Sequence, residues 1–385
     1  MARANDDTIN RQPATGLQLR SLITSSGILE LSLEAKDIDP PKADEVVVRI
    51  EAAPVNPSDL GLLLGPADLS TVTTRGEGAS RRTTITVPEA RLRAMAARLD
   101  KAMPVGNERA GIIVATGDNV KALLGKTVAV LGGAMYSEYR TITASNCLIF
   151  PDDITPAEAA ASFVNPLTAL GMVETMRKEG HTALIHTAAA SNLGQMLNRL
   201  CQKDAVDLVN IVRTPAQVDT LRNFGARYVC DSSADNFATQ LTEAVYATNA
   251  TIAFDAIGGG RIASKVLTAM EAAAARRMGN YSVYGSTAHK QVYIYGGLDT
   301  SATELTRSYG MAWSIGGWLL GPFIQKVGST RAAELRERVV SEIKTTFASH
   351  YSQTIGLAEL LRPEILQAIS RKATGEKFLV TPGRP

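Results

Sequence analysis

The chain contains few cysteines, and no motif pairs them. Its 385 residues include 3 cysteines that lie far apart in the sequence: Cys147, Cys201 and Cys230. Disulfide frameworks are typical of small secreted domains with an even number of closely spaced cysteines. The composition therefore excludes a disulfide-stabilised scaffold and favours a reducing compartment, which we expect to be the cytoplasm.

The sequence also lacks a segment suited to a membrane. Residues 1–16 are polar and contain no apolar core of a secretion signal. The most apolar stretch, Gly310–Ile324, is broken by four glycines and Pro322, and a spanning helix needs about 20 apolar residues. We expect this stretch to lie in the core or at a subunit contact. A net charge of +2 gives no reason to expect nucleic acid or an anionic membrane as a partner.

The pattern of short apolar segments predicts two kinds of domain. Up to residue 150 the chain shows short strands with Gly/Pro turns, such as Glu45–Ala52, which indicate a small β-barrel or sandwich. From residue 155, strands alternate with helices, which predicts a parallel, doubly wound sheet. The further expected strands are Ala110–Ala115, Lys126–Leu131, Glu138–Thr143, Cys147–Phe150, Thr182–His186, Ala205–Val212, Tyr228–Cys230, Thr251–Ala256, Gln291–Tyr295 and Lys377–Val380, and the expected helices are Thr155–Val164, Pro166–Arg177 and segments within 330–370.

One segment, residues 65–105, exceeds what a minimal barrel needs. It is rich in Thr, Arg and Gly and then shows helical periodicity over Pro88–Lys101. It is interpreted either as an inserted lid or partner surface, or as a surface excursion with no role in binding.

The segment 182–213 predicts the first half of a dinucleotide-binding unit. A buried strand is followed by a turn of small residues, a helix and a second strand. The G-x-G-x-x-G positions carry Ala189, Ser191 and Gly194, so two glycines are replaced. Small side chains still allow a pyrophosphate to approach backbone N–H groups at the helix start, and Asn192 and Leu193 are expected to belong to this site. Ser191 or Asn192 could add a side-chain donor. An ordinary strand-to-helix turn without a ligand is the alternative.

Arg213 ends the second strand and points to the identity of the nucleotide. It follows Gly194 by 19 residues, and a ribose-binding acid is expected about 20 residues after the fingerprint in NAD enzymes. An arginine there suits a 2′-phosphate, because a guanidinium is always charged and grips phosphate with two donors. Thr214 could donate a further hydrogen bond. The prediction is NADPH rather than NADH, and the alternative is a solvated charge at a strand end.

Several short motifs, in this order and spacing, resemble the medium-chain dehydrogenase/reductase superfamily over nearly the whole chain. Within it, the likeness is to the zinc-free NADPH:quinone oxidoreductases and the 2-enoyl thioester reductases. The motifs are VNPSD at Val55–Asp59, VGNERAGIIVATGDNV at Val105–Val120, NPLTA at Asn165–Ala169, AAASNLGQ at Ala188–Gln195, IVR at Ile211–Arg213, FDAIGGG at Phe254–Gly260, YGGL at Tyr295–Leu298 and TGEKFLVTP at Thr374–Pro382.

This resemblance implies an α/β fold with two domains. A GroES-like, β-rich catalytic domain would comprise residues 1–154 and 331–385, with 65–105 inserted in it. A Rossmann domain with a doubly wound parallel sheet would comprise residues 155–330. Substrate and nicotinamide would meet at the carboxyl ends of the parallel strands.

The sequence departs from the zinc-dependent relatives at their ligand positions. The Gly-His-Glu position is Gly106-Asn107-Glu108, no cysteine precedes Asn56, and the four histidines are dispersed. Because a zinc site needs three or four N, S or O ligands, we expect no metal. Hydride transfer to an electron-poor acceptor then fits better than alcohol oxidation.

The resemblance also implies which residues form the site. Asn56 and Asp59 would line the substrate side, and Asn165 and Thr168 would flank the nicotinamide. The segment Tyr295, Gly296, Gly297 and Leu298 would bind its carboxamide. Turn or helix capping is the alternative for Asn56 and Thr168.

The enoyl thioester reductases use a tyrosine of the N-terminal domain to help protonate the product, but here the first tyrosine is Tyr136. Tyr136 could replace that donor, although core packing is the competing interpretation. Four tyrosines cluster around the loop 276–290, where they could reach the cofactor or a partner or simply reflect strand propensity: Tyr281, Tyr284, Tyr293 and Tyr295.

These observations predict an NADPH-dependent reductase of quinones or activated alkenes (enones). A 2-enoyl thioester reductase is a second hypothesis, and a nucleotide-binding protein with little catalysis is a third. Because relatives pair through the edge of the nucleotide-domain sheet, we expect a homodimer.

Overall fold

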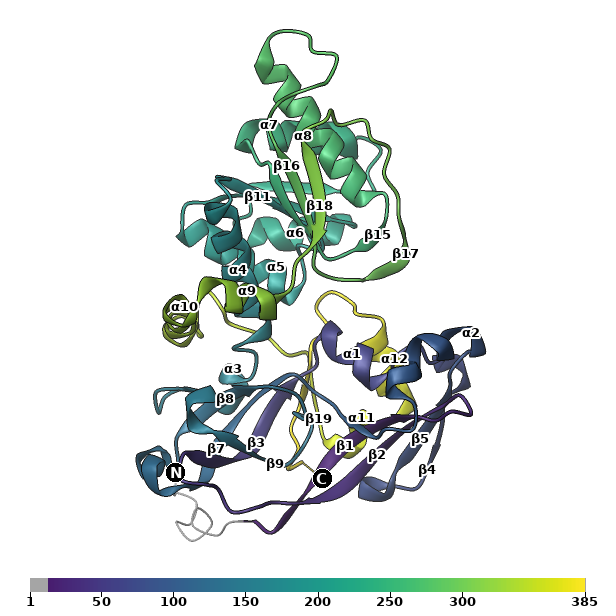
Figure 1. Cartoon of the computed structure of the whole chain (residues 1–385), viewed down its shortest axis with the longest axis vertical. Coiled ribbons are helices and arrows are strands. Elements are labelled where there is room, and N and C mark those ends of the chain that lie inside the picture. Colours follow the sequence, from purple (N-terminus) through teal and green to yellow (C-terminus); the bar gives the residue numbers. More distant parts are fainter. Residues whose placement is uncertain (1–12, 385) are drawn as a thin grey trace. The chain divides into compact units, whose positions relative to one another are not determined.

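The computed structural model describes residues 13–384. Residues 1–12 and residue 385 lie outside the described residues. They include most of the segment 1–16, in which we expect no secretion signal. The chain divides into two compact units (Figure 1): unit 1 comprises Met1–Val164 and Val340–Pro385, and unit 2 comprises Asn165–Val339.

Unit 1 is β-rich and is built from both ends of the chain. Within the described residues, one antiparallel sheet has the order β4-β5-β2-β1-β6. A second sheet has the order β10-β8-β7-β3-β20-β19, with β9 also paired to β3, and is antiparallel except for the parallel pair β19–β20. Figure 1 shows the yellow carboxyl-terminal segment among the purple and blue strands. The strands are β1 (Thr15–Ile23), β2 (Ile28–Asp37), β3 (Glu45–Pro54), β4 (Thr73–Arg75), β5 (Arg82–Thr86), β6 (Met103–Pro104), β7 (Glu108–Thr116), β8 (Thr127–Leu131), β9 (Tyr139–Thr143), β10 (Cys147–Ile149), β19 (Gln353–Ile355) and β20 (Phe378–Val380).

Short helices close unit 1 around its core. The α-helices are α1 (Pro57–Leu63), α2 (Glu89–Leu92), α3 (Pro156–Ala159), α11 (Leu357–Leu360) and α12 (Pro363–Ser370), and the 3-10 turns are η2 (Leu69–Thr71), η3 (Gly78–Ser80), η4 (Arg93–Arg98), η5 (Asp118–Leu123) and η6 (Ala144–Asn146). The main core joins side chains of β1 and β2 to Leu360 and Leu366 of the carboxyl-terminal segment. Burial of these apolar side chains from distant parts of the chain is what holds the last segment in place.

The segment 65–105 is built into the first sheet of unit 1. Its strands β4 and β5 extend the first sheet through pairing of β5 with β2. The helix expected over Pro88–Lys101 is reduced to α2 and the 3-10 turn η4. Leu92, Met95 and Leu99, which share the predicted apolar face, pack against the core of unit 1 as partly buried residues. The sequence pattern was therefore right about the face and wrong about a continuous helix.

Unit 2 is a doubly wound α/β domain. Within the described residues its parallel sheet has six strands in the order β13-β12-β11-β14-β16-β18. The strands are β11 (Ala183–His186), β12 (Asp207–Val212), β13 (Tyr228–Asp231), β14 (Ile252–Asp255), β16 (Lys290–Ile294) and β18 (Trp313–Gly317), with β15 (Gly258–Gly260) and β17 (Asp299–Thr303) forming a separate pair. The helices are α4 (Val164–Lys178), α5 (Asn192–Lys203), α6 (Pro215–Asn223), α7 (Phe237–Thr248), α8 (Ile262–Met278), α9 (Leu320–Val327) and α10 (Ser329–Ser341).

The sheet of unit 2 is covered on both faces. Ile211 of β12 belongs to a core shared with α7 and α8, whereas the next residue, Val212, packs with Leu221 of α6. Successive side chains of a strand point to opposite faces, so the two cores lie on opposite sides of the sheet. This arrangement confirms the predicted α/β fold with a β-rich domain and a doubly wound parallel sheet.

The boundaries of unit 2 fall later than the sequence pattern indicates. Helix α3 packs against β3, β7 and β8, so unit 1 extends to Val164 rather than to residue 154. Helix α10 stays with unit 2 because Arg331 Nη2 contacts Glu174 Oε1 at 2.8 Å and Arg338 Nη2 contacts Asp204 Oδ1 at 2.6 Å. Unit 2 therefore continues to Val339 instead of residue 330.

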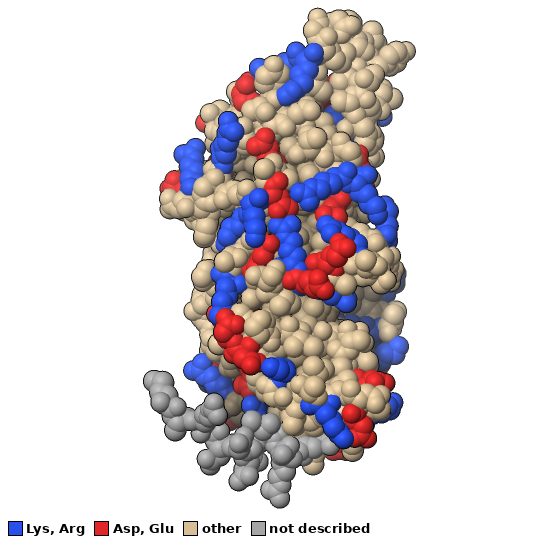
Figure 2. All heavy atoms as spheres, turned by 90° about the vertical axis from the view of Figure 1, so that its left-hand side faces the viewer, with Lys and Arg blue, Asp and Glu red and all other residues tan. Residues whose placement is uncertain are grey.

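The apolar stretch Gly310–Ile324 contains a strand that the sequence reading did not separate. Its residues Trp313–Gly317 form β18, which pairs in parallel with β16 as the edge of the sheet. Among the described residues, no helix combines the length and apolar character needed to cross a membrane. On the face shown in Figure 2, basic and acidic side chains are interspersed, as a net charge of +2 allows.

Candidate functional site

The turn between β11 and α5 brings the backbone of Ala189 close to that of Gly194. Ser191 caps α5, its Oγ accepting a hydrogen bond from the Gly194 N–H at 3.2 Å. A Cβ on Gly194 would overlap the carbonyl group of Ala189, so this position requires glycine. Ala188 adopts a left-handed conformation with φ of 52°. The turn thus has the tight geometry of a phosphate-binding loop, and Asn192 starts the helix whose first N–H groups lack intrahelical partners.

Arg213 lies exposed directly after β12. Its backbone N–H donates to Gln217 Oε1 at 3.1 Å, and no ion pair involves its guanidinium among residues 13–384. Thr214 caps α6, its Oγ1 accepting from the Gln217 N–H at 3.3 Å. Arg213 therefore directly precedes the N-cap residue of α6, at the end of the helix where the dipole favours an anion.

Asp255 at the end of β14 clamps the loops at this edge of the sheet, a role the sequence reading did not assign. It is buried and accepts hydrogen bonds from Thr187 Oγ1 at 2.7 Å, from the Ile257 N–H at 2.9 Å and from the Gly258 N–H at 3.1 Å. Thr187 Oγ1 in turn accepts from the Ala256 N–H at 2.8 Å. The carboxylate thereby fixes the strand ends on either side of it. The motif FDAIGGG contained this residue, but only the fold shows what it holds.

His186 and Tyr295 form a second buried pair at the same strand ends. His186 Nε2 lies 2.7 Å from the Tyr295 hydroxyl, and the two rings stack with centroids 5.8 Å apart. Burial lowers the pKa of His186 to about 3 and raises the pKa of Tyr295 above its usual range. Both side chains are therefore neutral at physiological pH, and the contact positions Tyr295 without placing a charge there.

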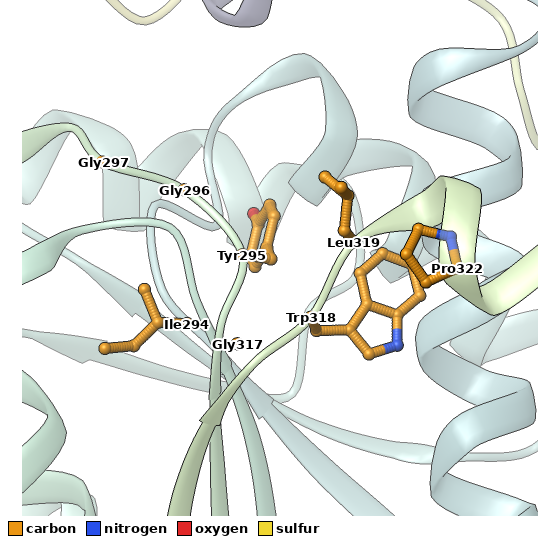
Figure 3. Close-up of a pocket in the computed structure, with 8 residues that line it drawn as sticks. All are labelled: Ile294, Tyr295, Gly296, Gly297, Gly317, Trp318, Leu319 and Pro322. Carbon is orange, nitrogen blue, oxygen red and sulfur yellow. The ribbon is translucent and has the colours of Figure 1, made fainter.

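A pocket opens between the segments that follow β16 and β18 (Figure 3). Its volume is about 480 Å³, within the range of small-molecule and cofactor sites. A Cβ on Gly296 would come within 2.6 Å of the Ala256 carbonyl oxygen, so the backbone can follow this path only with glycine. The Leu298 N–H donates to the Ala256 carbonyl at 3.1 Å, which fixes this segment beside the end of β14. The lining residues are Ile294, Tyr295, Gly296, Gly297, Gly317, Trp318, Leu319 and Pro322.

Asn165 and Thr168 lie in the first turns of α4 and are largely buried, with 9% and 6% of their surface exposed. Their spacing places them on one face of the helix. That they flank the nicotinamide stays a prediction.

In unit 1, Asn56 is the centre of a buried polar cluster. Its Nδ2 donates to Glu108 Oε1 at 2.7 Å, and its Oδ1 accepts from Lys377 Nζ at 2.9 Å. Glu108 Oε2 also accepts from the N–H groups of Phe163 at 2.8 Å and Val164 at 2.9 Å. These contacts fix the orientation of the Asn56 amide. Glu108 and Lys377 are functional candidates that the sequence reading missed, although both lie within motifs that it had singled out.

Asp59 belongs to the same cluster and joins two backbone segments of it. It accepts from the N–H groups of Asn56 at 2.8 Å and Asn107 at 2.9 Å. Burial is the main cause that raises the pKa of Asp59 to about 7, with a further contribution from the charge of Glu108. Asp59 therefore titrates near neutral pH.

Tyr136 is fully buried, and its hydroxyl donates to the Pro54 carbonyl at 3.3 Å. Burial raises the pKa of this phenol well above its usual value. The ring packs in the core of unit 1, and the hydroxyl also forms a hydrogen bond with the Asp59 carboxyl group, so Tyr136 borders the Asn56 cluster and a role as proton donor stays a prediction. Among the described residues, no group of three or more His, Cys, Asp or Glu side chains could hold a metal ion.

Solved structures with this architecture cover nearly the whole chain. A protein from Mesorhizobium loti assigned as an NADPH:quinone reductase superposes with a TM-score of 0.72 at 23% identity, covering 97% of this chain and 100% of its own. An enoyl thioester reductase from Candida tropicalis superposes with a TM-score of 0.66 at 18% identity, covering 96% of this chain and 100% of its own. The chain has the fold of the medium-chain dehydrogenases/reductases.

Curated relatives are similar over shorter stretches. The mitochondrial enoyl-[acyl-carrier-protein] reductase of Mus musculus is 28% identical over 197 residues, which is 49% of this chain and 45% of that protein. The synaptic vesicle membrane protein VAT-1 homolog of Rattus norvegicus is 28% identical over 160 residues, which is 40% of this chain and 38% of that protein. The chain thus spans about half the length, or less, of these relatives. No family model matches the chain.

Proposed function

We propose that this protein is an NADPH-dependent, zinc-independent oxidoreductase that transfers hydride to a small quinone or an activated alkene. The observation that carries the proposal is the edge of unit 2, where the Gly194 turn lies one strand away from the unpaired Arg213. A pyrophosphate at the start of α5 and a 2′-phosphate beside Arg213 would each meet the donors that they need. The fold shared with an NADPH:quinone reductase supports this assignment.

The pocket of unit 2 would hold the nicotinamide end of the cofactor. Bound NADPH supplies the hydride. The Gly296 and Gly297 backbone lines the pocket and offers hydrogen-bonding groups to the nicotinamide carboxamide. Tyr295 is held in place by neutral His186. Asp255 keeps the surrounding loops fixed. These residues bind and orient the cofactor, and a quinone acceptor needs no dedicated acid from the protein.

Enoyl thioester reduction is a second candidate, favoured by the curated relatives. The mouse relative is named an enoyl-[acyl-carrier-protein] reductase, and the similar Etr1p has been solved with NADP and crotonyl-CoA. An enolate product requires a proton donor. The first tyrosine, Tyr136, is buried in the core of unit 1, so we rank this activity below quinone and enone reduction. A nucleotide-binding protein with little catalysis is the third candidate.

One experiment separates the three candidates. NADPH and NADH dissociation constants are measured by nicotinamide fluorescence, and NADPH consumption is followed with benzoquinone, methyl vinyl ketone and crotonyl-CoA. Turnover of the quinone or the enone supports our proposal, whereas turnover of crotonyl-CoA alone replaces it with the thioester reductase. Tight NADPH binding without turnover of any acceptor assigns a binding role, and equal affinity for NADPH and NADH contradicts the assignment of Arg213.

A further inference from the structure

A second pocket in unit 2 lies between α7 and α8, and none of its lining residues belongs to the expected nucleotide site. Its volume is about 260 Å³, which accommodates a small molecule only. Its lining combines small and apolar side chains with hydroxyl groups and two cations. The lining residues are Ala238, Leu241, Thr242, Arg261, Ser264, Lys265, Thr268, Ala269, Thr306 and Ser308. We call this the α7–α8 pocket.

The electrostatic character of the α7–α8 pocket is positive. Arg261 and Lys265 are one helical turn apart on α8, so both can face the same ligand. No aspartate or glutamate lines the pocket, and among the described residues neither cation forms an ion pair. The Lys265 ammonium lies 5.5 Å from the centroid of the Phe237 ring. Glu243, the acidic residue of α7, pairs instead with Arg276 in the last turn of α8.

The start of α8 adds to this potential. Arg261 occupies the N-cap position of a helix of 17 residues, and no side chain caps its first N–H groups. The amino terminus of a helix carries a partial positive charge that favours anions. The cations and the helix dipole therefore act on the same side of the pocket.

A count of hydroxyl protons shows a donor left for a ligand. Ser308 Oγ donates to Thr306 Oγ1 at 3.0 Å, and Thr306 Oγ1 and Ser264 Oγ share one hydrogen bond of 2.9 Å. The Thr306 N–H also donates to Ser264 Oγ at 3.1 Å. Three hydroxyl groups carry three protons, and these contacts among the described residues use two of them. Whichever of Ser264 and Thr306 donates, the other keeps a proton that can bind a ligand oxygen.

We propose that the α7–α8 pocket binds the phosphate group of a small phosphate ester. A guanidinium, an ammonium, a hydroxyl donor and a helix amino terminus converge there without a carboxylate, and this set matches a dianion with several acceptor oxygens. The hydroxyls of Thr242 and Thr268 donate to carbonyl groups of their own helices, to Ala238 and Ser264. Their oxygens remain acceptors, which suits hydroxyl groups on the body of the ligand.

The test is binding of radiolabelled inorganic phosphate to the full chain by equilibrium dialysis at constant ionic strength. Saturating NADP is present so that phosphate does not enter the nucleotide site. The double variant Arg261→Gln/Lys265→Gln removes both cations. Arg222→Gln/Lys326→Gln is the matched control, because it removes the same charge from exposed positions of α6 and α9. Arg213→Gln reports separately on phosphate bound at the proposed nucleotide site.

We expect one phosphate per chain, with affinity reduced at least about tenfold in the Arg261/Lys265 variant, since each charge-assisted contact contributes roughly that factor. The control and the Arg213 variant should keep wild-type affinity. The proposal is overturned if wild-type protein binds no phosphate, if the Arg261/Lys265 variant binds as well as wild type, or if only Arg213→Gln abolishes binding. Failure of NADP to bind would contradict the proposed function and leave the comparison of the two double variants valid.

Discussion

Replacement of Arg213 by glutamine tests the central claim about the nucleotide. The variant keeps a polar side chain of similar reach at the end of β12 but removes the charge. The backbone N–H of residue 213 still donates to Gln217, and Thr214 still caps α6. Because the guanidinium forms no ion pair among residues 13–384, the substitution breaks none and folding should not change. The effect should appear only in the binding of a ligand that carries the 2′-phosphate.

The expected magnitude follows from the exposure of Arg213. A hydrogen bond to a charged group contributes roughly 1.5–3 kcal/mol, which is about 10- to 100-fold in affinity. Arg213 is exposed to solvent, so water and salt screen the contact and the lower limit applies. NADPH affinity should therefore fall about tenfold in Arg213→Gln, and NADH affinity should change by less than about twofold.

Nicotinamide fluorescence titrations of both nucleotides against both proteins provide the assay, and higher salt should reduce the preference for NADPH. Arg222→Gln is the matched control, since Arg222 is also exposed and lies in the last turn of α6, away from the strand end. A parallel loss of NADPH and NADH affinity in Arg213→Gln would show that the residue supports the loop and does not recognise the phosphate. An unchanged preference for NADPH would refute the reasoning altogether.

Three further predictions concern stability. Gly194→Ala should destabilise the protein by about 1–3 kcal/mol in a denaturant titration, because overlap with the Ala189 carbonyl outweighs the better helix propensity of alanine; Gly321→Ala in α9, where a Cβ meets no atom, is the control and should not destabilise. The pKa of Asp59 rises from 3.8 to about 7 in the folded protein, so the folded state favours the neutral acid. The free energy of unfolding should therefore fall by up to about 4 kcal/mol between pH 4 and 7, and Asp59→Asn should flatten this slope. Lys290→Met should cost about 3–5 kcal/mol by leaving Glu271 buried without the ammonium that lies 2.7 Å from it, and Glu271→Gln/Lys290→Met should recover part of the loss.

The elements predicted best are those whose local pattern and tertiary role agree. Glu45–Ala52 is rich in valine and bounded by prolines, and it forms β3 at the centre of a sheet. The helix expected over Thr155–Val164 begins where predicted, since Thr155 caps α3 and accepts from the Glu158 N–H at 3.3 Å, but α3 ends at Ala159. Strand β18 was not separated, because glycines at positions 316 and 317 weaken its strand pattern and its only partner, among the described residues, is the distant β16.

Only part of the candidate site could be predicted from the sequence, for a similar reason. The positions of Gly194 and Arg213 follow from local chain geometry, so their spacing in the sequence carries the information. The contact between Asn56 and Glu108 joins residues 52 positions apart, and Lys377 reaches Asn56 from the other end of the chain. Such contacts depend on how the strands pair, which no local pattern encodes. The motifs marked these residues but could not show that they touch one another.

The turn after β11 shows why a fingerprint can lose two glycines and keep its geometry. The three glycines of such a motif meet different demands, namely a tight turn, an approach to phosphate and close packing of helix on strand. Here Ala188 makes the tight turn with φ of 52°, secured by the Ser191 N–H, which donates to its carbonyl at 3.0 Å. A left-handed alanine costs about 1–2 kcal/mol, which a folded domain can sustain. Only the packing demand cannot be met by a larger residue, because any Cβ at position 194 would overlap the carbonyl of Ala189. The glycine that the chain retains is thus the one that sterics enforce.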